Sequence, residues 1–584
     1  MYRAPVKDFR FVLDELLQVQ SLAGSQGLAD YSPELAESVL SEAARFSETV
    51  LEPINQSGDR EGAKWTPDGV LTAKGFKDAY RQFVEGGWPQ LGADPDFGGQ
   101  PMPHALVIAA QEMWASANLS FKLCPMLTQG AVEALHLNGL AAQKQKYLPR
   151  MVSGEWTGTM VLTEPHAGSD LGLVRTRAVP EGDHYRLFGQ KIFITWGDHD
   201  LTPNTIHMVL GRIEGAPAGV KGISLFVVPK LLVNDDGSLG ERNEVRCVSI
   251  EHKLGIHASP TCVLAFGDQK GAVGYLVGEP NRGLEYMFIM MNAARLSVGV
   301  EGYAMAERAF QRAADWARTR VQGQGKAIIQ HPDVKRMLLT MKSGTEAMRA
   351  LGMYAAFQLD LAAHHADEAG RAAAQRRADL LIPVVKAWST EFGNELTATG
   401  VQVHGGMGFI EETGAAQYIR DARITTIYEG TTGIQANDLI GRKIGRDQGA
   451  AMSAFIAEMQ KELEALPESD EGVRATRVAV LESVGLLREA TQSLLQALAS
   501  APERGLAVAV PFLMLTGFTA GGWLLARSAG VSAGKLGGAD RDFHAAKIQT
   551  ARFYAENVLP RTLAFARIVK SGAGSTVEVD AASI

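Results

Sequence analysis

Residues 184–195 read HYRLFGQKIFIT, and they carry the clearest β-structure signal in the chain. Apolar and polar side chains alternate in the first half of this stretch, which is the two-residue period of a half-buried strand. The Gly189-Gln190 pair predicts a tight turn into a second strand, and further apolar runs follow, such as ISLFVV at 223–228. The region from 159 to 282 is therefore predicted to form a hairpin-rich sheet or small barrel.

Helical patterns flank this region on both sides. Before it, Ser32 and Pro33 make a favourable helix start, with a capping hydroxyl followed by proline at the first helical position. After it, amphipathic stretches around 298–320 and 333–370 have the spacing of long helices. The sequence thus predicts an α+β multidomain protein in four parts: a helical N-terminal domain (1–158), a central β-barrel or β-sandwich domain (159–282), a helical bundle (283–449) and an extra C-terminal helical domain (450–584).

Length and composition exclude several classes of protein. A chain of 584 residues exceeds the usual size of one hydrophobic core. Its net charge of −8 argues against a general affinity for nucleic acid or anionic membranes. Three separated cysteines provide neither a disulfide framework nor a zinc site, which favours a reducing compartment. No secretory signal, peroxisomal tag or lipidation motif is recognisable, so a cytoplasmic protein is expected.

One segment, residues 505–526, has 22 residues without a charge and is long enough to span a bilayer. Pro511, Gly517, Gly521 and Gly522 interrupt it, and its flanks have neither an aromatic belt nor a strong Lys/Arg asymmetry. We favour a buried helix pair inside a C-terminal bundle. Membrane association stays open as the alternative.

The segment IYEGTTGIQ at 427–435 combines a carboxylate with glycine and threonine after apolar residues. Glycine lets the backbone approach a ligand closely, and threonine hydroxyls can bind polar cofactor atoms. A carboxylate in an apolar, water-excluded pocket has a raised pKa and becomes a useful general base. Glu429 is thus a candidate base, although the motif alone more simply fits a helix start with an acidic residue in its first turn.

Three further segments are suited to a polar, flat cofactor. VLTEPHAGSD at 161–170 is a loop rich in backbone donors and hydroxyls, and KIFITWG at 191–197 ends a strand in an aromatic and a hydroxyl. QVHGGMGF at 402–409 has paired glycines that permit close approach to a diphosphate or adenosine. Each alone is also compatible with a turn or a packing feature. No Gly-x-Gly-x-x-Gly opens a helix after a strand and no P-loop motif occurs, so neither a Rossmann domain nor a P-loop is predicted.

In this order and spacing, the four segments resemble the acyl-CoA dehydrogenase family over about residues 35–446. The resemblance implies a helical N-terminal domain, a central β-domain and a C-terminal helical domain, the same order that the residue patterns predict. It implies that FAD lies between the β-domain and the second helical domain and that the neighbouring subunit completes the site. It also implies a homodimer for an extended chain, and an electron-transfer flavoprotein as partner.

The same resemblance implies roles for individual residues. Glu429 matches the catalytic base, which takes the Cα proton of an acyl-CoA while flavin N5 accepts the Cβ hydride, giving a trans-2-enoyl-CoA. Positions that match FAD contacts are Met160, Leu162, Thr163, Ser169, Phe193, Thr195, Arg320, Gln402, Gly406 and Thr431. Positions that match substrate contacts are Ser169, Arg295, Glu429 and Gly430. No metal site is expected.

Several positions depart from the family pattern. His166 stands where glycine is usual, Trp196 stands where asparagine is usual, and Gly433 replaces a side chain that often helps to bind FAD. After Arg320 the sequence reads VQGQGK instead of the usual Phe-Gly-Lys ending, which predicts a differently shaped diphosphate loop. Some members carry the base on the preceding helix, but the corresponding residue here is Ala294, so Glu429 is the stronger candidate.

The finer resemblance is to large bacterial members with a helical C-terminal extension. This group includes fatty acyl-CoA dehydrogenases and 3-methylmercaptopropionyl-CoA dehydrogenases. A fatty acyl-CoA is the expected substrate, and 3-methylmercaptopropionyl-CoA is the alternative. An acyl-CoA oxidase and a non-catalytic, DNA-associated flavoprotein of the same fold are weaker alternatives. Residues 451–584 contain 13 Lys and Arg against 14 Asp and Glu, which argues against a DNA-binding module.

Overall fold

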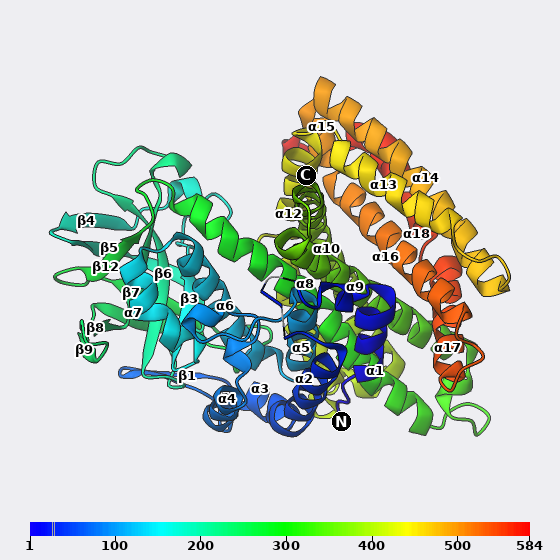
Figure 1. Cartoon of the computed structure of the whole chain (residues 1–584), viewed down its shortest axis with the longest axis horizontal. Coiled ribbons are helices and arrows are strands. Elements are labelled where there is room, and N and C mark those ends of the chain that lie inside the picture. Colours follow the sequence, from blue (N-terminus) through cyan, green and yellow to red (C-terminus); the bar gives the residue numbers. More distant parts are fainter. Residues whose placement is uncertain (26, 29) are drawn as a thin grey trace. The chain divides into compact units, whose positions relative to one another are not determined.

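The computed structural model describes residues 1–25, 27–28 and 30–584, which form two compact units. Unit 1 comprises Met1–Ala44, Pro103–Ser116 and Arg295–Ile584, and unit 2 comprises Arg45–Met102 and Ala117–Ala294. The predicted order along the chain, with helices, a sheet, further helices and additional C-terminal helices, is confirmed (Figure 1).

The elements follow one another along the chain as the colours of Figure 1 show. The helices before the main sheet are α1 (Val6–Arg10), α2 (Pro33–Phe46), α3 (Asn55–Glu61), α4 (Phe76–Glu85), α5 (His104–Ala117), α6 (Leu119–Asn138) and α7 (Ala141–Val152). The strands are β1 (Lys64–Thr66), β2 (Gly69–Leu71), β3 (Trp156–Val161), β4 (Arg177–Glu181), β5 (His184–Thr195), β6 (Asn204–Ile213), β7 (Ser224–Pro229), β8 (Leu231–Val233), β9 (Leu239–Arg242), β10 (Val245–Ile250), β11 (Thr261–Phe266) and β12 (Ala272–Val277). The later helices are α8 (Gly283–Thr319), α9 (Pro332–His364), α10 (Glu368–His404), α11 (Ala415–Arg423), α12 (Thr432–Asp438), α13 (Ala450–Glu464), α14 (Glu471–Ser500), α15 (Pro502–Ala507), α16 (Ala509–Ala533), α17 (Arg541–Asn557), α18 (Arg561–Ser571) and α19 (Ala573–Val577).

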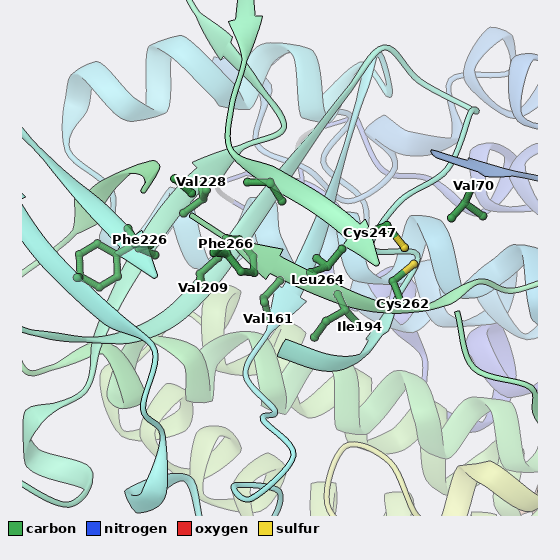
Figure 2. Close-up of a cluster of buried hydrophobic side chains, with 14 residues drawn as sticks. Val70, Val161, Ile194, Val209, Phe226, Val228, Cys247, Cys262, Leu264 and Phe266 are labelled. Atoms are coloured by element: carbon green, nitrogen blue, oxygen red, sulfur yellow. The ribbon is translucent and has the colours of Figure 1, made fainter. Parts of the chain in front are cut away.

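The main sheet of unit 2 has the strand order β10-β11-β5-β12-β7-β6-β3, and β4 pairs with both β5 and β6. Neighbouring strands are antiparallel, except that β6 runs parallel to β3 and to β4. Inward side chains such as Val161, Phe226 and Leu264 form its buried core (Figure 2). Cys247 and Cys262 belong to this core with their sulfur atoms turned toward one another, and both thiols are free.

The tight turn predicted at Gly189-Gln190 is wrong. β5 runs without a break from His184 to Thr195, and Gly189 lies within its ladder with β11. A Cβ atom at Gly189 would lie 2.5 Å from the hydroxyl of Thr176. The glycine therefore permits a close approach of neighbouring backbone and does not mark a turn.

The hairpin formed by β1 and β2 lies in a stretch that the sequence patterns treated as helical. Two aspartates that follow β5 hold it. Asp198 accepts a hydrogen bond from the N–H of Val70 at 3.3 Å, and Asp200 accepts one from the N–H of Thr72 at 3.0 Å. The short strands are thus recognisable only from these long-range contacts, because six residues carry too little periodicity to predict a hairpin.

The uncharged C-terminal segment forms one long helix, α16, preceded by the short α15, instead of the predicted helix pair. Pro511 lies in the first turn of α16, where a missing N–H costs nothing. A Cβ atom at Gly517 would lie 2.2 Å from the ring of Trp388, so the small residues let α16 approach α10 closely. Among the described helices, α16 is the one long and apolar enough to cross a membrane, and 83% of its most apolar window is buried inside the protein. That burial favours a core helix of the bundle.

A buried ionic cluster connects α1, α5, α8, α9 and α17 in unit 1. At its centre, the guanidinium of Arg349 donates hydrogen bonds to Glu112 at 2.5 Å and to Glu307 at 2.8 Å. A third bond of Arg349 reaches Asp8 at 2.6 Å, and Lys547 also binds Asp8. We name these residues the Arg349 cluster: Asp8, Glu112, Glu307, Lys342, Glu346, Arg349 and Lys547.

Candidate active site

Glu429 and Gly430 form a left-handed turn directly before α12, with φ angles of +56° and +89°. A non-glycine residue in this region is uncommon and strained, so surrounding contacts must hold it. The hydroxyl of Thr431 caps α12 by accepting a hydrogen bond from the N–H of Ile434 at 3.3 Å. Glu429 therefore lies outside the helix, and the simpler interpretation of the motif as an acidic first turn does not apply.

The carboxylate of Glu429 is desolvated. Burial raises its pKa to about 7, the cations Arg295 and Lys386 partly oppose that rise, and the carboxylate of Glu301 adds to it. The residue as a whole is nevertheless partly exposed, so the carboxylate is removed from bulk water without being sealed off. A pKa near the operating pH is the favourable value for a general base.

Glu429 also presents polar groups that no described residue binds. None of the described residues donates a hydrogen bond to its carboxylate, and none accepts one from the backbone N–H groups of Glu429 and Gly430. Consecutive N–H groups in such a turn form a concave set of donors that suits an oxygen atom carrying negative charge. A carboxylate and a backbone donor suited to an oxyanion thus occur on the same residue.

Two charged contacts fix the surroundings of Glu429 to α8. Arg295 is buried, and its Nη1 lies 3.4 Å from the carboxylate of Asp438 on α12. The hydroxyl of Tyr428 donates a hydrogen bond to Glu301. Burial holds the pKa of Tyr428 well above its usual value, so this hydroxyl stays protonated as a donor. Of the residues predicted to contact substrate, the structure brings Arg295, Glu429 and Gly430 together within unit 1.

The residues predicted to contact the flavin ring in unit 2 lie at adjoining strand ends. The carbonyl of Thr163, which follows β3, accepts a hydrogen bond from the N–H of Ile192 at 2.9 Å, beside Phe193 on β5. Phe193 has a left-handed φ of +61°, and 59% of it is exposed. An exposed aromatic ring on a strained backbone is suited to a flat cofactor. Near it, Met160 is buried in β3, Leu162 is half-buried, Thr195 ends β5, and Ser169 is exposed on the next loop.

The loop that carries Ser169 is organised by Glu164. One carboxylate oxygen of Glu164 accepts hydrogen bonds from the N–H and the hydroxyl of Thr176 at 2.9 and 2.6 Å. The same oxygen lies 3.0 Å from the ammonium of Lys191, which also donates to the carbonyl of Leu162 at 2.8 Å. The glutamate within the 161–170 motif therefore shapes the loop.

In unit 1, the residues predicted to contact the FAD diphosphate and adenosine lie where α8 and α10 end. Trp316 on α8 stacks on His404 of α10 with 5.3 Å between ring centroids, and Arg320 lies over the Trp316 ring at 5.9 Å. Arg320 forms no ion pair with any described residue, and nothing lies within 4 Å of a Cβ atom built at Gly406. An unpaired arginine beside open glycine backbone fits a diphosphate. Gln402 lies exposed on the last turn of α10.

Two residues at the site were missed by the sequence patterns. Lys386 of α10 is fully buried, and its ammonium donates to the carbonyl of Gly430 at 2.7 Å. The side-chain amide of Gln435 donates to the carbonyl of Glu429 at 3.0 Å. A signal for Lys386 exists in the sequence, because it is a single charge within the apolar run 381–388. Such a charge is buried only when it has a partner.

Family models cover nearly the whole chain. Residues 33–155 match the acyl-CoA dehydrogenase N-terminal domain, residues 159–269 match the middle domain, and residues 281–444 match the C-terminal domain. Residues 455–580 match a domain described as acetyl-CoA dehydrogenase C-terminal like.

Full-length relatives agree with these matches. The chain is 48% identical to a 3-methylmercaptopropionyl-CoA dehydrogenase of Ruegeria pomeroyi over 96% of both chains. It is 36% identical to FadE5 of Mycobacterium tuberculosis, a broad-specificity linear acyl-CoA dehydrogenase, over 100% of this chain and 99% of that protein. An acyl-CoA dehydrogenase of Bacillus anthracis, solved in complex with FAD, has the same fold with a TM-score of 0.76 at 20% identity, over 93% of this chain and 88% of that one. The chain therefore belongs to the acyl-CoA dehydrogenase family of FAD-dependent oxidoreductases.

Proposed function

We propose that the protein catalyses the α,β-dehydrogenation of 3-methylmercaptopropionyl-CoA to the corresponding trans-2-enoyl thioester, with Glu429 as the base. The observation that carries the reaction is the state of Glu429, a desolvated carboxylate with a pKa of about 7 and no bound partner among the described residues. The similarity to the Ruegeria pomeroyi enzyme over almost the whole chain supports this substrate.

The chain supplies two elements of the mechanism at one residue. The carboxylate of Glu429 removes the proton from the carbon next to the thioester carbonyl, and its raised pKa makes it a stronger base than an exposed glutamate. The backbone N–H of Glu429 donates to the thioester oxygen, where negative charge develops as the proton leaves. Arg295 and Lys386 keep the pKa of Glu429 from rising further, so that a useful fraction is deprotonated at neutral pH.

FAD supplies the acceptor for the Cβ hydride when it is bound. We propose that Met160, Leu162, Thr163, Ser169, Phe193, Thr195, Arg320 and Thr431 hold it, and that Gln402 and Gly406 reach the FAD of the neighbouring subunit. The exposed ring of Phe193, the unpaired cation of Arg320 and the open backbone at Gly406 support this assignment. The hydroxyl of Thr431 already caps α12, so its contact with the cofactor uses the remaining capacity of that oxygen.

A linear fatty acyl-CoA is the second candidate substrate, and the similarity to the Mycobacterium tuberculosis enzyme favours it. Either substrate leaves two electrons on the protein after each turnover. We propose that an electron-transfer flavoprotein removes them, as the family resemblance implies.

The substrate is tested by steady-state assays of the purified holoenzyme with an artificial electron acceptor. The substrates are straight-chain acyl-CoAs from four to eighteen carbons and 3-methylmercaptopropionyl-CoA. The highest kcat/KM is expected for 3-methylmercaptopropionyl-CoA. A higher value for a linear chain favours the second candidate, and the absence of turnover with every thioester overturns the proposed function. Replacing the dye by purified electron-transfer flavoprotein tests the electron acceptor.

We further propose a cytoplasmic homodimer. The segment after α10 leaves large apolar side chains open in the isolated chain, with Phe409 85% exposed and Met407 and Ile410 each 44% exposed. Exposed apolar side chains that lie close together mark interaction surfaces. Sedimentation velocity is expected to give twice the chain mass, and a monomer with full FAD content would contradict the dimer.

A further inference from the structure

The left-handed turn at Glu429 and Gly430 needs support from outside the turn. Both residues have positive φ, and α12 begins two residues after Gly430. Two side chains bind their carbonyl groups, because Gln435 donates to both carbonyls and Lys386 donates to that of Gly430. These bonds set the planes of the two peptide groups, and hence the direction in which the side chain of Glu429 leaves the backbone.

Lys386 and Gln435 are both fully buried in unit 1. The ammonium of Lys386 lies 2.7 Å from the carbonyl of Gly430. The amide nitrogen of Gln435 lies 3.0 Å from the carbonyl of Glu429 and 3.4 Å from that of Gly430. The carbonyl oxygen of the Gln435 side chain is buried without a hydrogen-bond partner among the described residues. Both side chains thus lose hydration in order to bind this one turn.

Burial of these groups is costly. A buried ammonium loses several kcal/mol of hydration energy, and an apolar side chain of similar volume is often as stable or more stable. No carboxylate forms an ion pair with Lys386 among the described residues, so its closest partner is the neutral carbonyl of Gly430. A role in stability alone therefore does not explain a lysine at this position.

The charge of Lys386 also acts on Glu429. The groups that act on the carboxylate of Glu429 are Arg295 and Glu301 on α8 and Lys386 on α10. Asp438 on α12 already pairs with Arg295, and Glu301 accepts a hydrogen bond from the hydroxyl of Tyr428. Burial lowers the pKa of Lys386 to about 8, and the carboxylates of Glu429, Glu301 and Glu391 oppose that fall, so the lysine is cationic at neutral pH.

We propose that Lys386 and Gln435 are positioning residues that fix the left-handed turn of Glu429 and Gly430, with Lys386 also stabilising the carboxylate form of the base. This inference rests on the proposed function, because it assumes that Glu429 removes the substrate proton. The two roles differ in their signatures. Gln435 is uncharged, so its removal disturbs geometry alone, whereas removal of Lys386 disturbs geometry and charge.

The test compares Lys386→Met and Gln435→Met holoenzymes with the wild type. Methionine matches glutamine in length and is one atom shorter than lysine, and it removes the hydrogen bonds of both side chains. Both variants are expected to lose about 10- to 100-fold in plateau kcat with KM changed by less than about threefold, because a displaced base affects the chemical step more than binding. In Lys386→Met, the acidic limb of the profile of kcat/KM against pH should shift to higher pH by roughly one unit. The reason is that a nearby cation no longer favours the carboxylate form of Glu429. In Gln435→Met the limb should stay in place.

A second readout does not depend on turnover. Infrared titration of the free holoenzyme, with the Glu429→Gln spectrum subtracted, gives the pKa of Glu429 directly. The same upward displacement is expected in Lys386→Met and not in Gln435→Met. Lys443→Met is the matched control, because it removes a half-buried lysine of unit 1 that pairs with Asp379 at 3.8 Å. This variant should leave both kcat and the acidic limb of the pH profile unchanged.

The outcomes separate this inference from the proposed function. The positioning role is overturned if both variants keep the wild-type plateau kcat and the wild-type acidic limb. If Glu429→Gln is inactive in the same assays, its assignment as the base is unaffected. Full turnover in Glu429→Gln overturns both. If Lys386→Met does not yield folded holoenzyme, the plateau kcat of Gln435→Met decides, since an unchanged value there contradicts the positioning of the turn.

Discussion

Glu429 and Glu112 are two buried glutamates of the same unit, and burial raises the pKa of both to about 7. Their surroundings differ. Glu112 receives hydrogen bonds from the guanidinium of Arg349 at 2.5–3.0 Å and is 1% exposed. Glu429 is partly exposed, and no described residue binds its carboxylate. A raised pKa therefore does not identify a catalytic base, and the distinguishing property is a desolvated carboxylate that remains accessible and without a partner.

The Arg349 cluster shows why a buried carboxylate can keep a raised pKa beside an arginine. As defined above, the cluster contains four carboxylates and three cations, so full ionisation leaves one negative charge in excess. A proton on Glu112 removes that excess. In contrast, Lys547 and Arg349 hold the pKa of Asp8 well below its usual value despite burial, so Asp8 stays ionised. The cluster joins five helices through paired charges, whereas the carboxylate of Glu429 has no partner among the described residues.

The largest expected effect is a difference in kcat between variants of the two glutamates, Glu429 and Glu112. Glu429→Gln should retain FAD and the wild-type melting temperature while kcat falls by at least about 10³-fold, because the amide cannot accept the substrate proton. Stopped-flow reduction of the flavin measures the chemical step directly. Glu112→Gln is the matched control, with the same substitution at a residue remote from the turn, and should keep kcat within about twofold. Equal losses of kcat in the two variants would contradict a catalytic role that Glu429 has and Glu112 lacks.

The next effect concerns stability. Arg349→Met leaves Glu112, Glu307 and Asp8 without their shared cation, and the free energy of unfolding should fall by about 3–5 kcal/mol. Urea denaturation measures it. The control is Arg336→Met, which removes an exposed arginine paired with Asp333 and should cost at most about 0.5 kcal/mol. A stable Arg349→Met variant would show that the cluster is not needed to hold the helices together.

The pH dependence of the wild-type enzyme is the third expectation. The base must be deprotonated, and the pKa of Glu429 in the free enzyme is about 7. The value of kcat/KM should therefore rise about tenfold per pH unit below pH 7 and level off above it, since this parameter reports ionisation of the free enzyme. A profile that is flat from pH 5.5 to 8 would contradict Glu429 as a base with a raised pKa.

The smallest expected effect concerns Glu112 and the direction in which its proton changes the free energy of unfolding with pH. Its folded pKa of about 7 exceeds the unfolded value of about 4.3, so the folded state holds the proton more tightly. This stabilisation is fully present below about pH 4.3 and is lost as the pH rises through about 7. Glu112→Gln lacks this dependence. Its unfolding free energy, measured in urea at pH 5.5 and 8, should change with pH by roughly 2 kcal/mol less than that of the wild type. Identical changes would show that the proton resides elsewhere in the cluster.

The sequence alone determined the order of the helical and β-rich regions and the four segments at which a flavin-dependent site could form. These features are local, since a strand period, a helix start and a glycine beside a carboxylate can be read within about ten residues. It also singled out Glu429, but only through the joint order of the four segments. The false turn at Gly189 shows the limit of local interpretation, because the reason for that glycine is the close approach of Thr176, which directly precedes β4.

The tertiary structure decided which polar groups share a buried space. Lys386 lies 43 positions before Glu429, and Arg295 lies 134 positions before it, yet both act on its carboxylate. Desolvation and electrostatic interaction depend on distance in space and on exclusion of water, and neither is encoded in a local pattern. For the same reason the sequence named Glu429 as a candidate base, whereas its pKa of about 7, its left-handed backbone and the hydrogen bonds of Lys386 and Gln435 to its turn follow only from the folded chain.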